Sequence, residues 1–228
     1  MGEALEAGAA IELILVTEEA REKSEVALLL RKAGSVRIPL SAVSAREMDR
    51  LSDAVTAQGI LAVAIASAPT LDEFWRHRSG RSMIVALEHV ADPGNVGTIL
   101  RTCDWFGIDA VFLSRECVEL LNPKVLRATM GALFHLPVFT DVDLPPVLAM
   151  AKEHGYEVAV TALAGGKPPL RDSMGEKSIL VLGNEAFGIS SAVMQSADRI
   201  VTIPRLGRGE SLNVGSACAA ILGSLLIR

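Results

Sequence analysis

From residue 82 to the C-terminus, apolar segments of strand length alternate with segments whose apolar residues recur at helical spacing. This alternation is typical of a parallel sheet with helices on both faces, because each parallel connection needs a crossover. The expected strands are Met83–Leu87, Ala110–Leu113, Val138–Thr140, Glu157–Thr161, Ile179–Leu182 and Arg199–Ile203. The expected helices are Val96–Phe106, Pro145–His154, Ser190–Gln195 and Asn213–Leu226. Such sheets bind ligands at the carboxyl ends of their strands, so the loops there are the candidate site.

Residues 1–68 carry a second, smaller α/β pattern. A strand is expected at Ile11–Val16, followed by a helix at Glu18–Lys32 with Thr17 as its N-cap and Gly34 as its stop. The remaining expected elements are a strand at Ser35–Pro39, a helix at Ser44–Leu51 and a strand at Ile60–Ala66.

The segment between the two patterns contains Pro69, Gly80 and a run of charge, which predicts a connector. We therefore expect a domain at 1–68, a linker at 69–81 and a second domain at 82–228. The densest basic cluster of the chain, Arg76, His77, Arg78 and Arg81, lies in this linker. Two interpretations stay open for it, a solvated linker and a contact with RNA.

Composition limits the classes of function. Half of the 228 residues are hydrophobic, which is enough for a sizeable core, yet no apolar run approaches the length of about 18 residues that a membrane span needs. The N-terminus lacks the pattern of a signal peptide, so a cytoplasmic protein without a membrane contact is expected. The net charge of −5 argues against a broad, non-specific binder of nucleic acid. A local basic surface, or one assembled by two copies in a dimer, still permits RNA binding.

Cysteine and histidine give no sign of a metal site or a disulfide framework. The three cysteines, Cys103, Cys117 and Cys218, are odd in number and widely separated. The four histidines are equally scattered, so no metal is expected. A glycine fingerprint for dinucleotides, a Walker-type loop and a serine-nucleophile motif are also missing from the sequence.

Three segments at expected strand ends have the composition of a site. The first runs from Leu87 to Arg101, with a turn at Pro93 and Gly94, Asn95 as a helix cap, and Arg101 returned toward the cleft by helical spacing. An ordinary turn with a capping Asn and a surface Arg is the alternative. The second segment runs from Leu182 to Gly188 and holds Glu185 between glycines that permit close backbone approach.

The third segment runs from Ile203 through a glycine- and arginine-rich loop into the last helix. Ser211 or Asn213 is expected to cap that helix and still face the cleft. The helix is crowded with small residues, which suits either a packed interior helix or a subunit interface.

Taken together and in this order, the three segments resemble the motifs of the SpoU (TrmH-type) family of RNA ribose 2′-O-methyltransferases. The resemblance covers about residues 81–228, and 122–132 is similar to the family's middle region. It implies an α/β-knot, in which the C-terminal segment threads a loop, a homodimer, S-adenosylmethionine as cofactor and structured RNA, rRNA or tRNA, as partner. Residues 1–68 look like the family's small ribosomal-protein-like substrate domain, starting late, at its first helix (Glu3–Gly8).

The resemblance also implies roles for individual residues. Arg101 is expected at the ribose 2′-oxygen as a cation that stabilises the developing alkoxide, since a guanidinium stays protonated, while a phosphate or water takes the proton. Asn95 and Asn213 orient Arg101 and the substrate, Glu185 pairs with Arg101 or with a cofactor-side donor, and Ser211 fixes the loop. The expected cofactor-binding residues are Thr161, Leu182, Gly183, Ile203, Leu212 and Asn213. The expected RNA-binding residues are Arg76, Arg78, Arg205 and Arg208.

Two other functions remain as alternatives. A non-catalytic RNA-binding protein on the same scaffold would not need the set Asn95, Arg101, Glu185 and Asn213. A nucleotide-dependent enzyme with a Rossmann sheet would be expected to carry the glycine fingerprint that this sequence lacks.

Overall fold

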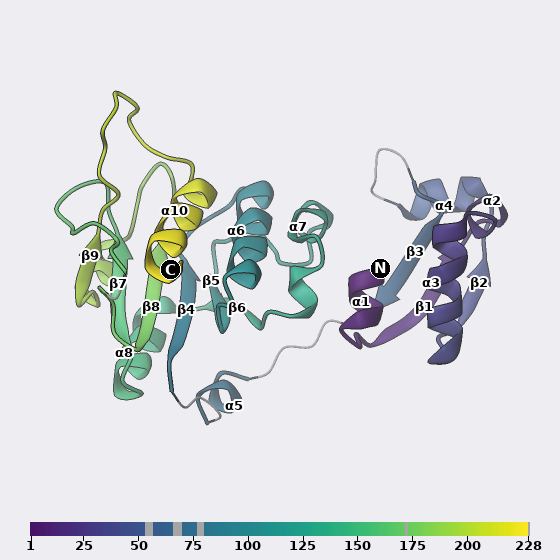
Figure 1. The fold of residues 1–228 in the computed structure, drawn as a ribbon, viewed down its shortest axis with the longest axis horizontal. Coiled ribbons are helices and arrows are strands. Elements are labelled where there is room, and N and C mark those ends of the chain that lie inside the picture. Colours follow the sequence, from purple (N-terminus) through teal and green to yellow (C-terminus); the bar gives the residue numbers. More distant parts are fainter. Residues whose placement is uncertain (53–56, 66–69, 77–79, 172, 228) are drawn as a thin grey trace. The chain divides into compact units, whose positions relative to one another are not determined.

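The computed structural model describes residues 1–228 except 53–56, 66–69, 77–79, 172 and 228. The chain divides into two compact units, Met1–Ser67 and Ala68–Arg228, and each has its own sheet and its own core (Figure 1). Among the helices of the described residues, none has the length and apolarity needed to cross a membrane.

The first unit contains a three-stranded sheet in the order β2-β1-β3. β1 (Ile11–Val16) pairs in parallel with β2 (Leu40–Ala42) and antiparallel with β3 (Ile60–Ala64). The strand expected at Ile11–Val16 is confirmed, as is a helix in the region of Glu3, where α1 spans Gly2–Glu6. α4 (Ala45–Leu51) is also confirmed, and it begins with a capping box between Ser44 and Glu47.

Three expectations for the first unit are wrong: the single helix, its stop at Gly34 and the position of the second strand. The helix expected at Glu18–Lys32 is two helices, α2 (Glu18–Arg21) and α3 (Ser24–Ser35), because the backbone of Lys23 is extended between them. Thr17 does cap α2, accepting a hydrogen bond of 3.2 Å from the backbone N–H of Ala20.

The strand expected at Ser35–Pro39 lies further along the chain, at β2 (Leu40–Ala42). α3 continues through Gly34, which therefore is not its stop, and ends at Ser35. Arg37 then takes a left-handed φ of 58°, so the chain turns here and the segment is not extended.

The second unit is built on a six-stranded sheet in the order β6-β5-β4-β8-β7-β9, with every pairing parallel. The parallel sheet expected from the alternation is confirmed. The threading of the C-terminal segment through a loop stays a prediction. The strands are β4 (Ser82–Leu87), β5 (Ala110–Ser114), β6 (Val138–Val142), β7 (Glu157–Thr161), β8 (Lys177–Leu182) and β9 (Arg199–Val201).

Helices cover both faces of this sheet. Val85 and Leu87 of β4 join the core cluster that includes α6 and α10, whereas Ile84 and Ala86 face the cluster that includes α5, α8 and α9. The alternation of neighbouring residues between two clusters explains why the strands are apolar throughout. The helices are α5 (Leu71–Arg76), α6 (Pro93–Trp105), α7 (Pro123–Thr129), the 3₁₀ turn η1 (Ala132–Phe134), α8 (Leu144–Glu153), α9 (Ser191–Gln195) and α10 (Val214–Leu226).

The segment expected as a linker contains α5, and this part of the linker assignment is wrong. Phe74 and Trp75 of α5 are buried in the core of the second unit, where their rings meet edge to face with a centroid distance of 5.1 Å. Thr70 and Glu73 cap the helix reciprocally, with Glu73 accepting from the backbone N–H of Thr70 at 2.9 Å. α5 is therefore a part of the second unit's core.

Candidate functional site

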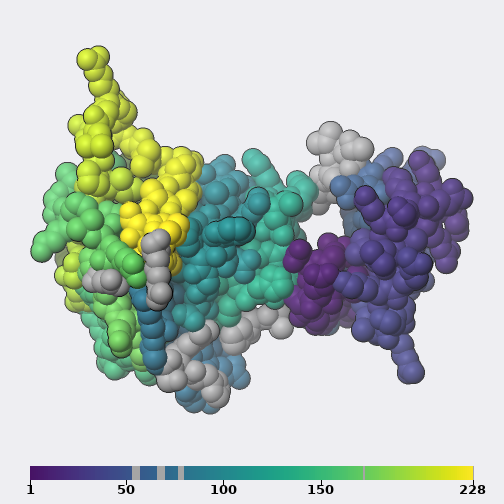
Figure 2. All heavy atoms as spheres, viewed as in Figure 1, coloured from purple at the N-terminus to yellow at the C-terminus, as the bar shows by residue number. Residues whose placement is uncertain are grey.

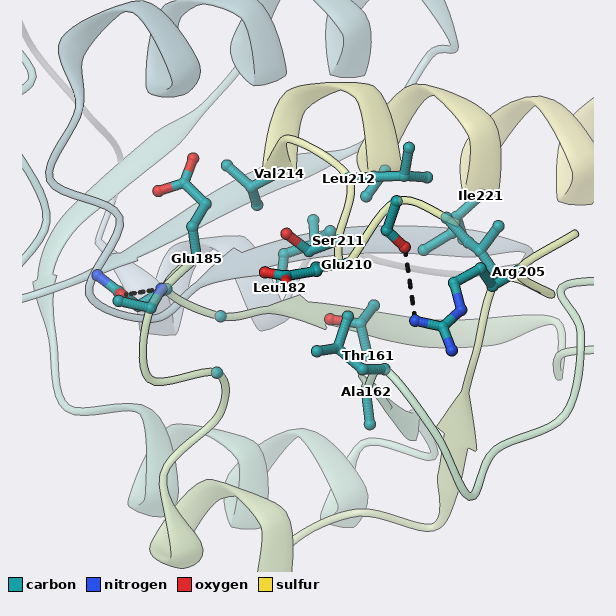
Figure 3. Close-up of a pocket in the computed structure, with 18 of the residues that line it drawn as sticks. Thr161, Ala162, Leu182, Glu185, Arg205, Glu210, Ser211, Leu212, Val214 and Ile221 are labelled. Carbon is teal, nitrogen blue, oxygen red and sulfur yellow. Dashed lines mark hydrogen bonds between the residues drawn. The ribbon is translucent and has the colours of Figure 1, made fainter. Parts of the chain in front are cut away.

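A cavity of about 540 Å³ opens at the carboxyl ends of β7 and β8. Its walls come from four places: the end of β7, the loop 182–188 after β8, the loop 203–212 before α10, and one side of α10 (Figure 3). In the close-up, Thr161 and Ala162 lie on one side of the cavity and Leu212 and Ile221 on the other. The cavity thus occupies the position at which parallel α/β sheets bind ligands.

The loop after β8 folds back tightly on itself. A Cβ atom on Gly183 would lie 2.5 Å from the carbonyl carbon and oxygen of Gly188, a contact that real side chains do not make. The backbone N–H of Gly188 donates to the carbonyl of Asn184 at 2.8 Å, and the φ of Gly188 is +69°. Glycine is therefore required at 183 for close approach, and the backbone of this loop is directly presented to the cavity.

Three polar side chains from three loops form one hydrogen-bonded chain. Nδ2 of Asn213 donates to Oδ1 of Asn95 at 2.8 Å, and Nδ2 of Asn95 donates in turn to Glu185. These residues follow β4, β8 and β9 and are far apart in sequence. The network therefore ties the cavity loop, through Glu185, to the start of α6 and the start of α10.

The helix caps in this region differ partly from expectation. The N-cap of α6 is Asp92, whose carboxylate accepts from the backbone N–H of Asn95 at 2.8 Å, so Asn95 itself is not the cap. This leaves the amide of Asn95 free to bind Glu185 and Asn213. Asn213 does cap α10, because its Oδ1 accepts from the backbone N–H groups of Gly215 and Ser216.

Arg101 does not reach the cavity. It lies on α6 six residues after Asn95, is exposed to solvent, and is not among the residues that line the cavity. Within the described residues it makes no hydrogen bond or ion pair, and Glu185 bonds to Asn95 instead. The expected pairing of Glu185 with Arg101 is therefore absent from this arrangement.

Most of the expected cofactor residues do line the cavity: Thr161, Leu182, Gly183, Ile203 and Leu212. Asn213 is the exception, since it caps α10 beside the cavity. Of the expected catalytic residues, Glu185 and Ser211 lie in the wall. The sequence therefore brings the right loops together, although it does not fix which side chains point into the space.

The expected RNA-binding arginines do not form one patch within a single chain. Arg205 lines the cavity, and Arg208 is exposed on the same loop, which stands out from the body of the second unit (Figure 2). Arg76 ends α5, which lies near the start of β4, at the end of the strands opposite to the cavity (Figure 1). Arg78 lies outside the described residues.

Asn184 is a residue of the site that the sequence analysis missed. Its Oδ1 accepts from the backbone N–H groups of Ala186 and Phe187, and its Nδ2 donates to the carbonyl of His89 at 2.8 Å. The signal was available, because an Asn that begins a tight turn commonly bonds to the backbone two residues on. In the described residues, no cluster of His, Cys, Asp and Glu could hold a metal ion.

Comparison with known families gives two matches that together cover most of the chain. The model of the SpoU rRNA Methylase family matches residues 82–223. The model described as RNA 2′-O ribose methyltransferase substrate binding matches residues 2–70.

Individual proteins agree with these matches. The 23S rRNA (guanosine(2553)-2′-O)-methyltransferase RlmP of Bacillus subtilis is 37% identical over 61% of this chain, which spans 56% of the length of RlmP. A TrmH-family protein of Staphylococcus haemolyticus is 31% identical over 96% of this chain and 89% of its own length. The crystal structure of the SpoU methyltransferase AviRb from Streptomyces viridochromogenes, in complex with the cofactor AdoMet, superimposes with a TM-score of 0.86 at 25% identity, covering 98% of this chain and 84% of AviRb.

Proposed function

The chain belongs to the SpoU rRNA methylase family, and from this premise we propose that it transfers a methyl group from S-adenosylmethionine to a ribose 2′-hydroxyl in structured RNA. The observation that carries the proposal is the cavity at the carboxyl ends of β7 and β8, walled by the loops after β7, β8 and β9. The target RNA, rRNA or tRNA, is left to experiment.

The cavity fits this cofactor in size and in the chemistry of its walls. Its volume of about 540 Å³ is within the range of pockets that enclose ligands of drug size. Apolar side chains such as Leu182, Ile203 and Leu212 supply contact area, and the backbone at Gly183 supplies polar groups at close range. We propose that these residues, with Thr161, hold the cofactor, while Asn213 supports the cavity wall from beside it by capping α10.

The bound cofactor supplies an activated methyl group on a sulfonium, so the protein's own task is to position the ribose hydroxyl and to stabilise its charge. We assign that charge stabilisation to Arg101, which lies exposed on α6 outside the cavity wall and whose guanidinium stays protonated and donates in a planar fork. A phosphate of the RNA or a water molecule accepts the proton. Asn95, Glu185 and Asn213 form the hydrogen-bonded chain that fixes the loops around the reacting oxygen, and Ser211 contributes to the third loop.

A non-catalytic RNA-binding protein is the second candidate. The chain Asn213–Asn95–Glu185 speaks against it, because a protein that only binds RNA has no need to keep three loops tied across a cavity. The exposed Arg205 and Arg208 beside the cavity suit a phosphate backbone in either case.

We also propose a division of labour and an assembly. Residues 1–68 are assigned to substrate binding and 82–228 to catalysis, in keeping with the two matched family models. The assembly is a homodimer in the cytoplasm, formed through the exposed faces of α6 and α10. Trp105 at the end of α6 is 86% exposed, and the outer side of α10 presents small residues such as Ala220 that permit close helix packing.

Calorimetry and methyl transfer test the activity. The protein should bind S-adenosylmethionine or its demethylated product with an affinity in the micromolar range, roughly −8 kcal/mol. Incubation with labelled cofactor and total RNA should label one ribose 2′-oxygen, which mapping then identifies. A folded sample that gives no heat of binding at high concentration would contradict the proposal.

Sedimentation tests the dimer. Ala220→Glu places a charge on the exposed side of α10 and should shift the protein to a monomer at tens of micromolar. Ala192→Glu, on the exposed surface of α9, is the matched control and should leave the dimer intact. A wild-type monomer with full activity at that concentration would refute the assembly.

A further inference from the structure

Glu88 carries a carboxylate in an unusual place, directly after the last residue of β4. The residue is only 4% exposed, and both of its carboxylate oxygens are bonded to a single residue, Ser190. Oε2 accepts from the backbone N–H of Ser190 at 2.9 Å, and Oε1 accepts from its hydroxyl at 2.6 Å. Burying a carboxylate is costly unless such bonds compensate it. The two bonds therefore hold together residues that are 102 positions apart in the chain.

Ser190 lies two residues after Gly188, where the cavity loop ends. It is the N-cap of α9, and its hydroxyl also accepts from the backbone N–H of Val193 at 3.3 Å. Glu88 therefore fixes the far end of the cavity loop at the point where the chain enters α9.

The near end of the same loop is fixed by the next residue, His89. The side chain of Asn184 donates to the carbonyl of His89 at 2.8 Å. His89 adopts a left-handed φ of 58°, which a non-glycine residue holds only where surrounding contacts maintain it. One such contact is the hydrogen bond of 3.0 Å from the backbone N–H of His89 to the hydroxyl of Ser114, at the end of the neighbouring β5.

Two consecutive residues after β4 thus hold both ends of the loop that forms one wall of the cavity. Between those ends, Glu185 and Phe187 are exposed, so the loop's shape depends on its anchored ends, on its internal backbone bonds and on the bond of Glu185 to Asn95. Neither Glu88 nor His89 lines the cavity itself.

We propose that Glu88 is a positioning residue for cofactor binding: by holding Ser190, it sets the shape of the 183–188 loop against which the cofactor lies. The proposal rests on the proposed function, since it assumes that the cavity takes S-adenosylmethionine. It assigns to Glu88 an effect on cofactor affinity that is larger than its effect on the methyl-transfer step.

Three variants weaken the contact between Glu88 and Ser190 to different degrees. Glu88→Ala removes both acceptors and should raise the Kd for S-adenosylhomocysteine about tenfold to a hundredfold, the range expected for loss of hydrogen bonds to a charged group. Glu88→Gln keeps the shape and one acceptor and should restore a part of that loss. Ser190→Ala keeps the backbone N–H but removes the hydroxyl, and combined with Glu88→Gln it should add little to either change alone.

The matched control is Ser82→Ala. Ser82 begins the same strand, is equally buried, and accepts a hydrogen bond of 2.8 Å from the hydroxyl of Tyr156. This variant should lower the thermal midpoint as the Glu88 variants do, but leave the Kd within about twofold of the wild type.

The readouts are the Kd by calorimetry, the thermal midpoint, and the split between KM for the cofactor and kcat. A rise in KM and Kd larger than the fall in kcat supports the proposal. A wild-type Kd in a folded Glu88→Gln and a folded Ser190→Ala overturns it, and so does an equal loss of affinity in Ser82→Ala.

If the wild-type protein binds no cofactor, the proposed function is wrong, and the role of Glu88 that rests on it is wrong as well. If the wild-type protein binds the cofactor and only the variants give a contradicting result, the role of Glu88 is wrong and the proposed function is unaffected. If Glu88→Ala does not fold, the Gln and Ser190 variants decide.

Discussion

The side-chain amide of Asn213 donates a hydrogen bond of 2.8 Å to Oδ1 of Asn95, 118 residues earlier in the chain. The other end of the same amide caps α10, because Oδ1 of Asn213 accepts from the backbone N–H groups of Gly215 and Ser216. The cap therefore fixes which atom of Asn213 faces Asn95. Asn95 must then direct its own N–H₂ toward Glu185, so the orientation of all three groups is set by one helix start.

Asn213→Asp separates the cap from the network. An aspartate caps a helix as well as asparagine does, so the thermal midpoint should hardly change. The new oxygen faces Oδ1 of Asn95, and turning the Asn95 amide would only bring its oxygen against Glu185. Single-turnover methyl transfer should therefore fall by about tenfold or more, the size of a lost hydrogen bond with an acceptor left unpaired.

The control for this prediction is Asn122→Asp at the N-cap of α7, where the Asn side chain accepts from the backbone N–H of Lys124 at 2.9 Å. It should preserve both the rate and the midpoint. An unchanged rate in Asn213→Asp would mean that the network does not serve the reaction.

Gly183 and Gly207 offer a matched pair of glycine substitutions in the same cavity. A Cβ at Gly183 would lie 2.5 Å from backbone atoms of Gly188, whereas a Cβ at Gly207 would meet nothing within 4 Å. Gly183→Ala should displace the loop and weaken binding of S-adenosylhomocysteine by about tenfold or more, in line with the cost of overpacking. Gly207→Ala should leave the Kd, measured by calorimetry, near the wild-type value. Equal affinities for the two variants would show that the 183–188 loop is not part of the cofactor-binding site.

The main features of the second unit follow from patterns that the sequence displays. Glu157–Thr161 was predicted as a strand with the observed bounds, since its apolar core is enclosed by polar turns. α5 was missed, although Thr70 and Glu73 have the spacing of a capping box, because the nearby charges and Pro69 favoured a linker.

The sequence predicts which loops form the site, but it predicts less well how the side chains in those loops pair with one another. The sequence pattern predicts the three motifs at strand ends, and the sheet order shows that the first two follow the adjacent strands β4 and β8, whereas the third follows β9, which lies beyond β7. The partner of Glu185 was not predictable, because the choice between Asn95 and Arg101 depends on Asp92 taking the cap of α6. The buried contact of Glu88 with Ser190 joins residues too far apart for any local pattern to reveal.

Asp198 gives the second unit a pH dependence. Burial raises the pKa of this carboxyl, but hydrogen bonds from the Lys152 ammonium, at 2.7 Å, and from the backbone N–H of Val158 outweigh burial and lower it below the ordinary value of 3.8. A lowered folded-state pKa means that the stabilisation is complete above the unfolded-state pKa and is lost as the pH falls through the folded-state pKa.

Asp198→Asn should therefore lower the free energy of unfolding by about 1 kcal/mol at pH 7, a modest value because the pair is partly exposed and screened. The difference from the wild type should shrink as the pH falls below about 4. Denaturant unfolding at several pH values measures it. Lys152→Ala removes the same ion pair and should reduce this pH dependence as well. A difference that stays constant down to pH 2 would contradict the assignment.

Substitution of Arg101 distinguishes an effect on the methyl-transfer step from an effect on cofactor binding. If its guanidinium stabilises charge only as the ribose hydroxyl loses its proton, its effect belongs to the transition state. Arg101→Ala should then slow methyl transfer on the order of a hundredfold or more, as for the loss of one oxyanion-type donor. Cofactor affinity should hardly change, because Arg101 lies on α6 outside the cavity wall. Arg101→Lys keeps the charge without the planar fork and should restore a part of the rate.

The control for Arg101 is Lys177→Ala, which removes a cation from the amino end of β8, whereas the cavity lies at the carboxyl end of this strand. Single-turnover rates with saturating RNA, together with separate measurements of cofactor Kd, distinguish the two roles. An exposed arginine without a role in the reaction would change the methyl-transfer rate by little, as Lys177→Ala should; the comparison concerns the rate and not the stability, because Lys177 donates to the carbonyl of His154 at 3.3 Å. Turnover near the wild-type value in Arg101→Ala would therefore remove Arg101 from the mechanism. Because the cofactor's proposed contacts are all in other loops, that result would leave the cofactor site itself unaffected.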